Sequence, residues 1–151
     1  MLRRLLVGLL ILGGGFAALA QQRSQIDVEH YVIETEISPS THSLRATVQI
    51  RVAALEDDIT FAIFELHNSL NVASVTDGEG RSLPASRVDQ DSSIRLTFPE
   101  PLRKGQKAAI TFRYDGTLSG SEESPIPGIR MAAIHDEFAY LLYPARWFPL
   151  S

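Results

Sequence analysis

The stretch that decides the fold reads YVIETEI at residues 31–37 and, after a short turn, LRATVQIRV at residues 44–52. In both runs apolar and polar side chains alternate, which is the period-two pattern of a strand with one buried face. The intervening SPSTH at residues 38–42 is rich in turn-forming residues. The two runs therefore predict an antiparallel hairpin with a five-residue loop.

Five more strand-like runs lie further along the chain, at residues 59–66, 71–76, 81–88, 94–98 and 108–114. The first of them is apolar on both faces, which predicts a strand that is covered on both sides. Pro84 places its run at a sheet edge, and Pro99 and Pro101 predict the end of the run before them. No helical period occurs after residue 20. The predicted fold class is therefore all-β, an antiparallel β-sandwich or saddle-like domain of about seven or more strands.

The first twenty residues have the anatomy of a secretory signal peptide. Two arginines precede fifteen uncharged residues, and Ala18 and Ala20 are the small side chains that a signal peptidase recognises, with the cut before Gln21. The alternative is a retained membrane anchor, but a spanning helix needs about 20 apolar residues. We expect an exported protein, periplasmic or extracellular, with no stable membrane span.

The composition limits the chemistry of the mature chain, residues 21–151. Because the chain has no cysteine, disulfides and thiolate metal sites are excluded and its stability must come from a hydrophobic core. Without the two arginines of the leader, 12 basic residues stand against 18 acidic ones, and the basic residues are scattered. A nucleic-acid partner is therefore not expected.

No catalytic centre emerges from the motifs. The four histidines, at positions 30, 42, 67 and 135, lie at least twelve positions apart, whereas zinc ligands usually come in pairs a few residues apart. The HDE run at 135–137 is typical of a solvated turn, because neighbours on a strand point to opposite faces. The sequence lacks a G-x-S-x-G elbow and glycine-rich phosphate loops. We predict no catalytic, metal-binding or substrate-binding residue and no cofactor in this chain.

The last part of the chain changes character after residue 118. A loop rich in serine, proline and glycine is followed by a possible strand at 138–142, and then by Arg146, Trp147 and Phe148. Tryptophan and arginine are favoured anchors of interfaces, so these three residues are the candidate interface. We expect a β-sandwich domain over 21–118, and a loop and terminal segment over 119–151 that packs toward a part of the protein C-terminal to it.

Four stretches together carry a family resemblance: residues 31–37, residues 44–50, the spacing Phe98…Leu102…Gly105…ITFRYDG ending at residue 116, and YLLY at 140–143 followed by WFP at 147–149. They resemble the N-terminal β domain of M1-family zinc aminopeptidases, which has an "L-x-x-G … L-x-I-x-Y-x-G" stretch and a run into a Phe-Pro motif. The resemblance implies a domain that docks against a C-terminal catalytic domain, in an enzyme that hydrolyses peptides through a zinc-bound water.

Two departures from the family limit what is carried over. The zinc-binding H-E-x-x-H, its downstream glutamate and the G-A-M-E-N motif of the family belong to the catalytic domain and do not occur in residues 1–151. Leu141, Leu142 and Tyr143 stand near the place where the family has a glutamine or glutamate for the substrate's amino terminus. The resemblance therefore implies zinc and peptide binding only for a full-length parent.

Two hypotheses of different classes remain open. The chain is either the N-terminal fragment of an exported M1-like aminopeptidase, inert alone, or a complete small secreted β-sandwich that binds a protein or carbohydrate partner. A reading frame that continues into H-E-x-x-H would favour the first hypothesis.

Overall fold

The computed structural model describes residues 25–119 and 126–151. The predicted signal peptide, with Ala18 and Ala20, lies outside them. The described strands are β1 (Ile26–Ser38), β2 (Ser43–Ala54), β3 (Ile59–Glu65), β4 (Leu70–Asp77), β5 (Ala85–Val88), β6 (Ser93–Leu102), β7 (Lys107–Thr117), β8 (Ala132–Ile134) and β9 (Ala139–Leu141). Three single-turn 3₁₀ helices accompany them: η1 (Pro39–Thr41), η2 (Asp89–Asp91) and η3 (Tyr143–Ala145). The all-β fold class is confirmed.

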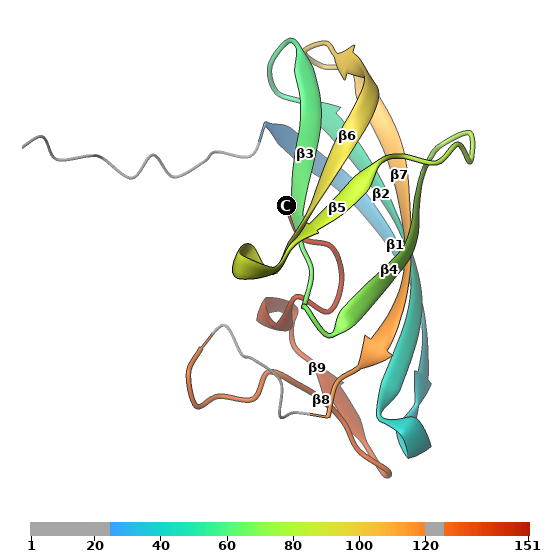
Figure 1. The fold of residues 1–151 in the computed structure, drawn as a ribbon, viewed down its shortest axis with the longest axis vertical. Coiled ribbons are helices and arrows are strands. Elements are labelled where there is room, and N and C mark those ends of the chain that lie inside the picture. Colours follow the sequence, from blue (N-terminus) through green and yellow to red (C-terminus); the bar gives the residue numbers. More distant parts are fainter. Residues whose placement is uncertain (1–24, 120–125) are drawn as a thin grey trace, which may run out of the picture.

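The larger sheet has the antiparallel order β1-β2-β7-β4 (Figure 1). Its first two strands form the predicted hairpin, in a register that pairs Ile33 with Val48. On β2 the alternation is complete, because Leu44, Ala46, Val48, Ile50 and Val52 are all buried. The period-two pattern that predicted this hairpin therefore also identified the face that it buries.

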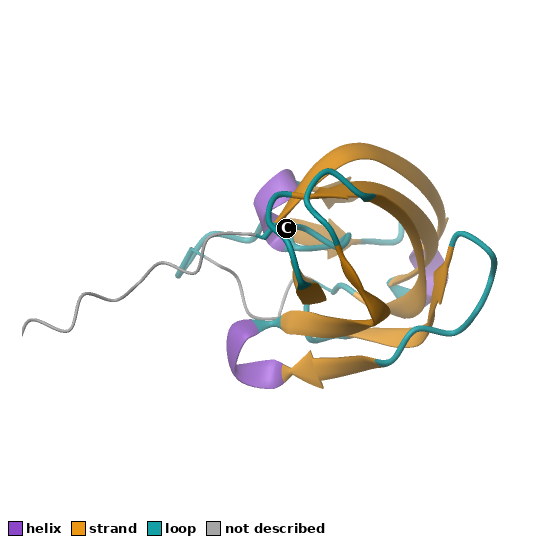
Figure 2. Cartoon of the chain, turned by 90° about the horizontal axis from the view of Figure 1, so that it is seen from above, coloured by secondary structure: helices purple, strands orange, loops and turns teal. Residues whose placement is uncertain are grey.

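A second sheet, of order β3-β6-β5, packs across the first. The ring centroids of Phe64 on β3 and Phe112 on β7 lie 5.3 Å apart in an edge-to-face contact, which joins the two sheets in one core. Seen from above, the strands curve around this common interior (Figure 2). The β8–β9 hairpin forms a separate two-stranded unit at the lower end of the molecule in Figure 1.

Two predictions about individual strands were wrong. β3 is covered on one face only: Ala62 and Phe64 are buried, whereas Ile63 is exposed and Phe61 lies beneath the guanidinium of Arg95 at 3.7 Å. Since β3 is the edge strand of a sheet with a solvent-facing side, its outward apolar residues have no covering layer.

Pro99 and Pro101 do not end β6, which continues to Leu102. The pairing between β3 and β6 is irregular at this point, because the register shifts between Ile59 and Phe61. A proline has no N–H to donate, and irregular stretches of a ladder are where strands tolerate it.

Gly116 allows the close packing of two strands onto β7. It pairs with Leu44 of β2 on one side and with Leu70 of β4 on the other. A Cβ atom at this position would collide with the carbonyl oxygen of Ser69 and with Leu70. With glycine at this position the strand extends beyond the run predicted at residues 108–114 and ends at Thr117.

Among the described residues, no helix is long and apolar enough to cross a membrane.

Candidate docking surface around the C-terminal segment

The terminal segment, residues 143–151, folds back onto the β domain. The backbone N–H of Glu65 on β3 donates to the carbonyl oxygen of Leu150 at 2.6 Å, and the N–H of Leu150 donates to the carbonyl oxygen of Glu65 at 2.9 Å. Leu150 thus extends the edge of β3 by one bridge, and the C-terminus lies beside β3 (Figure 1). The segment also turns sharply at Arg146, whose φ of 54° lies in the left-handed region.

Arg146 is partly buried and is held by two contacts. Its Nε lies 2.7 Å from Oε2 of Glu65, and its carbonyl oxygen accepts a hydrogen bond from the backbone N–H of His67 at 2.8 Å. The guanidinium of Arg146 is therefore paired with the carboxylate of Glu65 in the same domain.

Trp147 and Phe148 belong to an aromatic cluster inside this chain. Phe148 is only 7 % exposed. Its ring centroid lies 4.9 Å from that of Trp147, 5.5 Å from that of Tyr31 and 5.9 Å from that of Tyr143. The indole Nε1 of Trp147 is buried and has no hydrogen-bond partner. Residues of this chain therefore cover the ring of Phe148. The sequence instead predicts that the terminal segment packs toward a part of the protein C-terminal to it.

Burial also alters the acidity of two tyrosines around this cluster. Burial, with a smaller contribution from the charge of Tyr143, raises the pKa of Tyr31 to about 12. Burial likewise raises the pKa of Tyr114, whose hydroxyl donates to the carbonyl oxygen of Trp147 at 2.8 Å. Both phenols are therefore neutral at physiological pH and serve as hydrogen-bonding or packing groups.

A different set of side chains is open to solvent. Of the nine exposed large hydrophobic residues in the described part of the chain, five lie between positions 126 and 143, and we call them the apolar set: Ile126, Ile129, Phe138, Leu142 and Tyr143. Phe138 and Tyr143 are the most exposed, at 59 % and 67 %. Phe138 lies at the tip of the β8–β9 hairpin, where its ring is 4.6 Å from the ring of His135. A contiguous exposed apolar patch is typical of an interaction surface, and these five residues are the candidates for one in this part of the chain.

The exposed apolar set differs from the candidate interface that the sequence predicted, Arg146, Trp147 and Phe148, of which Phe148 is buried and Arg146 is paired with Glu65. The members of the apolar set lie in loops or at the ends of the short run 138–142, beside prolines, glycine and charged turn residues. That combination, apolar residues where no element can bury them, is the signal that would have found Phe138 and its neighbours.

Two of the four histidines, His42 and His67, make hydrogen bonds within the fold. Nδ1 of His42 lies 2.7 Å from the carbonyl oxygen of Ile134 and ties the β1–β2 turn to β8. Nδ1 of His67 accepts a hydrogen bond from the backbone N–H of Ser69. Residues 25–119 and 126–151 contain no group of three or more histidine, aspartate or glutamate side chains that could hold a metal ion. The described part of the chain therefore offers no set of side chains that fits a zinc ion.

Solved structures are the known proteins that the chain resembles. No family model and no curated protein matches the chain. Among solved structures, the M1 zinc metallopeptidase from Deinococcus radiodurans matches with a TM-score of 0.68 and 22% identity, over 83% of this chain and 29% of that one. A two-domain M1 zinc metallopeptidase mutant bound to L-tryptophan matches with a TM-score of 0.68 and 23% identity, over 85% and 30%.

The chain thus spans less than a third of the length of these two metallopeptidases. The match establishes the fold, which is that of a part of the M1 zinc metallopeptidases and is consistent with their N-terminal β domain alone.

Proposed function

We propose that this chain is the non-catalytic N-terminal β domain of an exported M1-like zinc aminopeptidase, an enzyme class that removes N-terminal residues from peptides. The observation that carries the proposal is a shared fold. It covers 83% of this chain but only 29% of an M1 zinc metallopeptidase mutant, whose structure was solved with a Tyr-Ser-Ala substrate bound. In this proposal the zinc and the peptide bind in the part of the enzyme that this chain does not include.

The domain's contribution is to dock the catalytic part. The apolar set (Ile126, Ile129, Phe138, Leu142 and Tyr143) is the surface that we assign to this contact. Depletion of charge and enrichment of aromatic side chains characterise the centre of a protein interface. One member of this set, Tyr143, also contacts the buried ring of Phe148, with ring centroids 5.9 Å apart.

The first experiment is to sequence the gene beyond the codon for Ser151. A frame that continues into H-E-x-x-H supports the proposal, and the longer product should hydrolyse a chromogenic aminoacyl substrate only when zinc is present. The 151-residue chain alone should give no turnover at any zinc concentration. An immediate stop codon, together with a stable and monomeric product, would instead favour a complete secreted β-sandwich that binds a protein or carbohydrate partner.

A second experiment tests the docking surface in the longer product. The double variant Phe138→Ser/Leu142→Ser should weaken the contact between the β domain and the catalytic domain. A protease should then cut the chain between the two domains faster. Ile63→Ser is the matched control, because Ile63 is also exposed but lies on the outer face of β3. Equal proteolysis of the two variants would contradict the assignment.

Export is part of the proposal and has its own test. N-terminal sequencing of the protein recovered from the periplasm or medium should begin at Gln21, after removal of Ala18 and Ala20 with the leader. Recovery of the intact chain in the membrane fraction would show instead that the leader is retained as an anchor.

A further inference from the structure

A groove opens on one side of the sandwich, between two strand edges. One wall is β4, an edge strand of the four-stranded sheet, and the other is β5, an edge strand of the three-stranded sheet. The groove has a volume of about 600 Å³. Small and polar residues dominate its walls, among them Asn71, Ser74, Ser82, Ala85 and Ser86.

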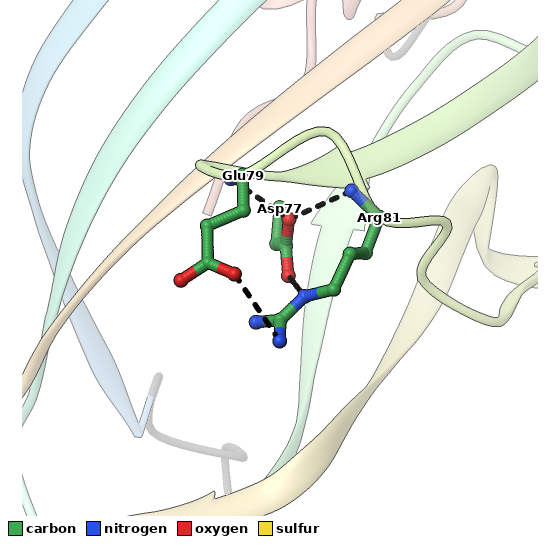
Figure 3. A network of polar contacts seen from close by, with 3 residues as sticks. All are labelled: Asp77, Glu79 and Arg81. Atoms are coloured by element: carbon green, nitrogen blue, oxygen red, sulfur yellow. Dashed lines mark hydrogen bonds and ion pairs between the residues drawn. The ribbon is translucent and has the colours of Figure 1, made fainter.

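One end of the groove is closed by the turn that joins the two strands. There the backbone N–H of Leu83 donates to the carbonyl oxygen of Val75 at 2.9 Å. The carboxylate of Asp77 organises the turn: Oδ1 accepts from the backbone N–H groups of Glu79 and Arg81, and Oδ2 accepts from Nε of Arg81 at 2.7 Å (Figure 3). Beyond this turn β4 and β5 diverge (Figure 1).

Arg87 bridges the other end of the groove. Its Nη1 donates to the carbonyl oxygen of Leu66 at 2.9 Å, and its Nη2 donates to the carbonyl oxygen of Leu70 at 2.5 Å. A side chain makes this link, because β4 and β5 belong to different sheets and are not paired with each other. The groove therefore has room between two edges that do not pair with each other.

The register shows which backbone groups of β4 point into the groove. In an antiparallel strand, residues alternate between bonding to one neighbour and pointing toward the other side. The carbonyl oxygen of Leu70 points into the groove, since it accepts from Arg87. Val72, two residues further on and still before the bulge at 72/74, shares that orientation. Its N–H therefore faces the groove, whereas its carbonyl group already belongs to the irregular stretch.

The same reasoning applies to β5. The carbonyl oxygen of Pro84 accepts from the N–H of Thr97 on β6 at 2.9 Å, so Pro84 is oriented toward β6. By alternation, the backbone groups of Ala85 and Arg87 point away from β6 and into the groove. Both walls thus present backbone donors and acceptors at strand spacing.

The fold already uses strand addition at another edge. The outer edge of β3 receives Leu150 through two backbone hydrogen bonds with Glu65. Among the residues that the structure describes, no segment is paired in this way between β4 and β5.

We propose that the groove between β4 and β5 binds an extended peptide segment by strand addition, over a length close to the four residues of β5. Backbone hydrogen bonds to Val72, Ala85 and Arg87 hold the peptide. Its inward side chains are small and apolar because they meet Leu83 and Ile94 at the floor, and its outward side chains face water. This site is independent of the docking surface assigned above.

The test uses the full chain and a defined probe, the pentapeptide acetyl-Thr-Val-Thr-Val-Thr-amide. At saturating probe, the amide hydrogens of Val72, Ala85 and Arg87 should exchange at least about tenfold more slowly, while that of Val48 in the central β2 stays unchanged. Unchanged exchange at all three groove amides would overturn the proposal.

Two variants at position 85 distinguish a backbone hydrogen bond to the peptide from a fit that depends only on the shape of the groove. Ala85→Pro removes the N–H that faces the groove and leaves the bonds between β5 and β6 in place, so binding should weaken about tenfold. Ala85→Val keeps that N–H and should bind within about twofold of the native chain. Equal affinities for these two variants would contradict the proposal.

A modified probe keeps the test valid if Ala85→Pro does not fold. Methylation of the two valine nitrogens removes donors from one edge of the peptide, and methylation of the three threonine nitrogens removes them from the other. Loss of binding in at least one methylated probe supports strand addition, and full binding of both refutes it. Protection that arises without probe, together with a dimer in sedimentation, would assign the groove to a second copy of the chain and overturn the proposal.

Discussion

The hydroxyl of Tyr114, on the central strand β7, donates a hydrogen bond of 2.8 Å to the main-chain carbonyl oxygen of Trp147. Tyr114 is 2 % exposed and belongs to the core, so this partly buried bond connects the core to the terminal segment. It explains why the aromatic end of the chain lies along the surface of the β domain instead of projecting from it.

Tyr114→Phe should therefore destabilise the domain. The substitution leaves the carbonyl oxygen of Trp147 without its partner, and an unsatisfied buried acceptor costs about 1–3 kcal/mol. Urea unfolding can be followed by the fluorescence of Trp147, the single tryptophan. The control is Tyr143→Phe, because Tyr143 is 67 % exposed and loses only a solvated hydroxyl. Equal stability of the two variants would contradict the role of the bond.

Stability should fall between about pH 10 and 12 in part because of Tyr31. Burial, and to a smaller degree Tyr143, raises the pKa of Tyr31 to about 12 in the folded chain, above the value near 10 of an unfolded chain. The unfolded chain thus loses this proton first. The stabilising contribution is complete below pH 10 and is lost as the pH rises toward 12.

Tyr31→Phe should make the urea midpoint less sensitive to pH over that range. Tyr114 also has a raised pKa and remains in both proteins, so the difference between them isolates Tyr31. A variant whose midpoint falls as steeply as that of the native chain would show that Tyr31 does not titrate in this way.

Gly116→Ala should be among the most damaging single changes. A Cβ atom there collides with the carbonyl oxygen of Ser69, which is backbone and cannot turn aside, so we expect a cost above about 2 kcal/mol. Gly105→Ala is the comparison, because Gly105 has a φ of +78° but open space around it. Left-handed strain alone costs about 1–2 kcal/mol. Thermal unfolding of both variants should rank Gly116→Ala as the less stable.

The pair Glu65 and Arg146 should contribute little by charge. Both side chains are partly exposed, at 50 % and 29 %, and exposed ion pairs contribute about 0–1 kcal/mol. Glu65→Gln should change the unfolding free energy by less than about 1 kcal/mol, and salt at about 1 M should reduce the difference further. A loss of several kcal/mol would show that this ion pair, and not the backbone bridge between Glu65 and Leu150, holds the segment.

The sequence predicted the features that depend on local periodicity. The alternation on β2 requires only that one face of a sheet be buried, so the hairpin, its buried face and the all-β class could be predicted before any tertiary contact was known. The strand near residues 138–142 is likewise confirmed as β9.

Long-range contacts explain the features that could not be predicted. Whether Phe61 and Ile63 are covered depends on whether another layer lies over β3, and no pattern within residues 59–65 records that. The course of β6 through two prolines depends on an irregular pairing with β3. The burial of Phe148 depends on Tyr31, more than a hundred residues earlier in the chain.

The two phenylalanines of the C-terminal part should separate stability from docking. Phe148 is 7 % exposed and contacts three aromatic rings, so Phe148→Ala should cost about 3–5 kcal/mol and shift the emission of Trp147 to the red. Phe138 is 59 % exposed, so Phe138→Ala should leave the unfolding free energy within about 0.5 kcal/mol. In the longer enzyme that we propose, however, Phe138→Ala should weaken the contact between the domains. If Phe138→Ala destabilised the isolated chain as much as Phe148→Ala, Phe138 would belong to the core of the domain and not to its docking surface.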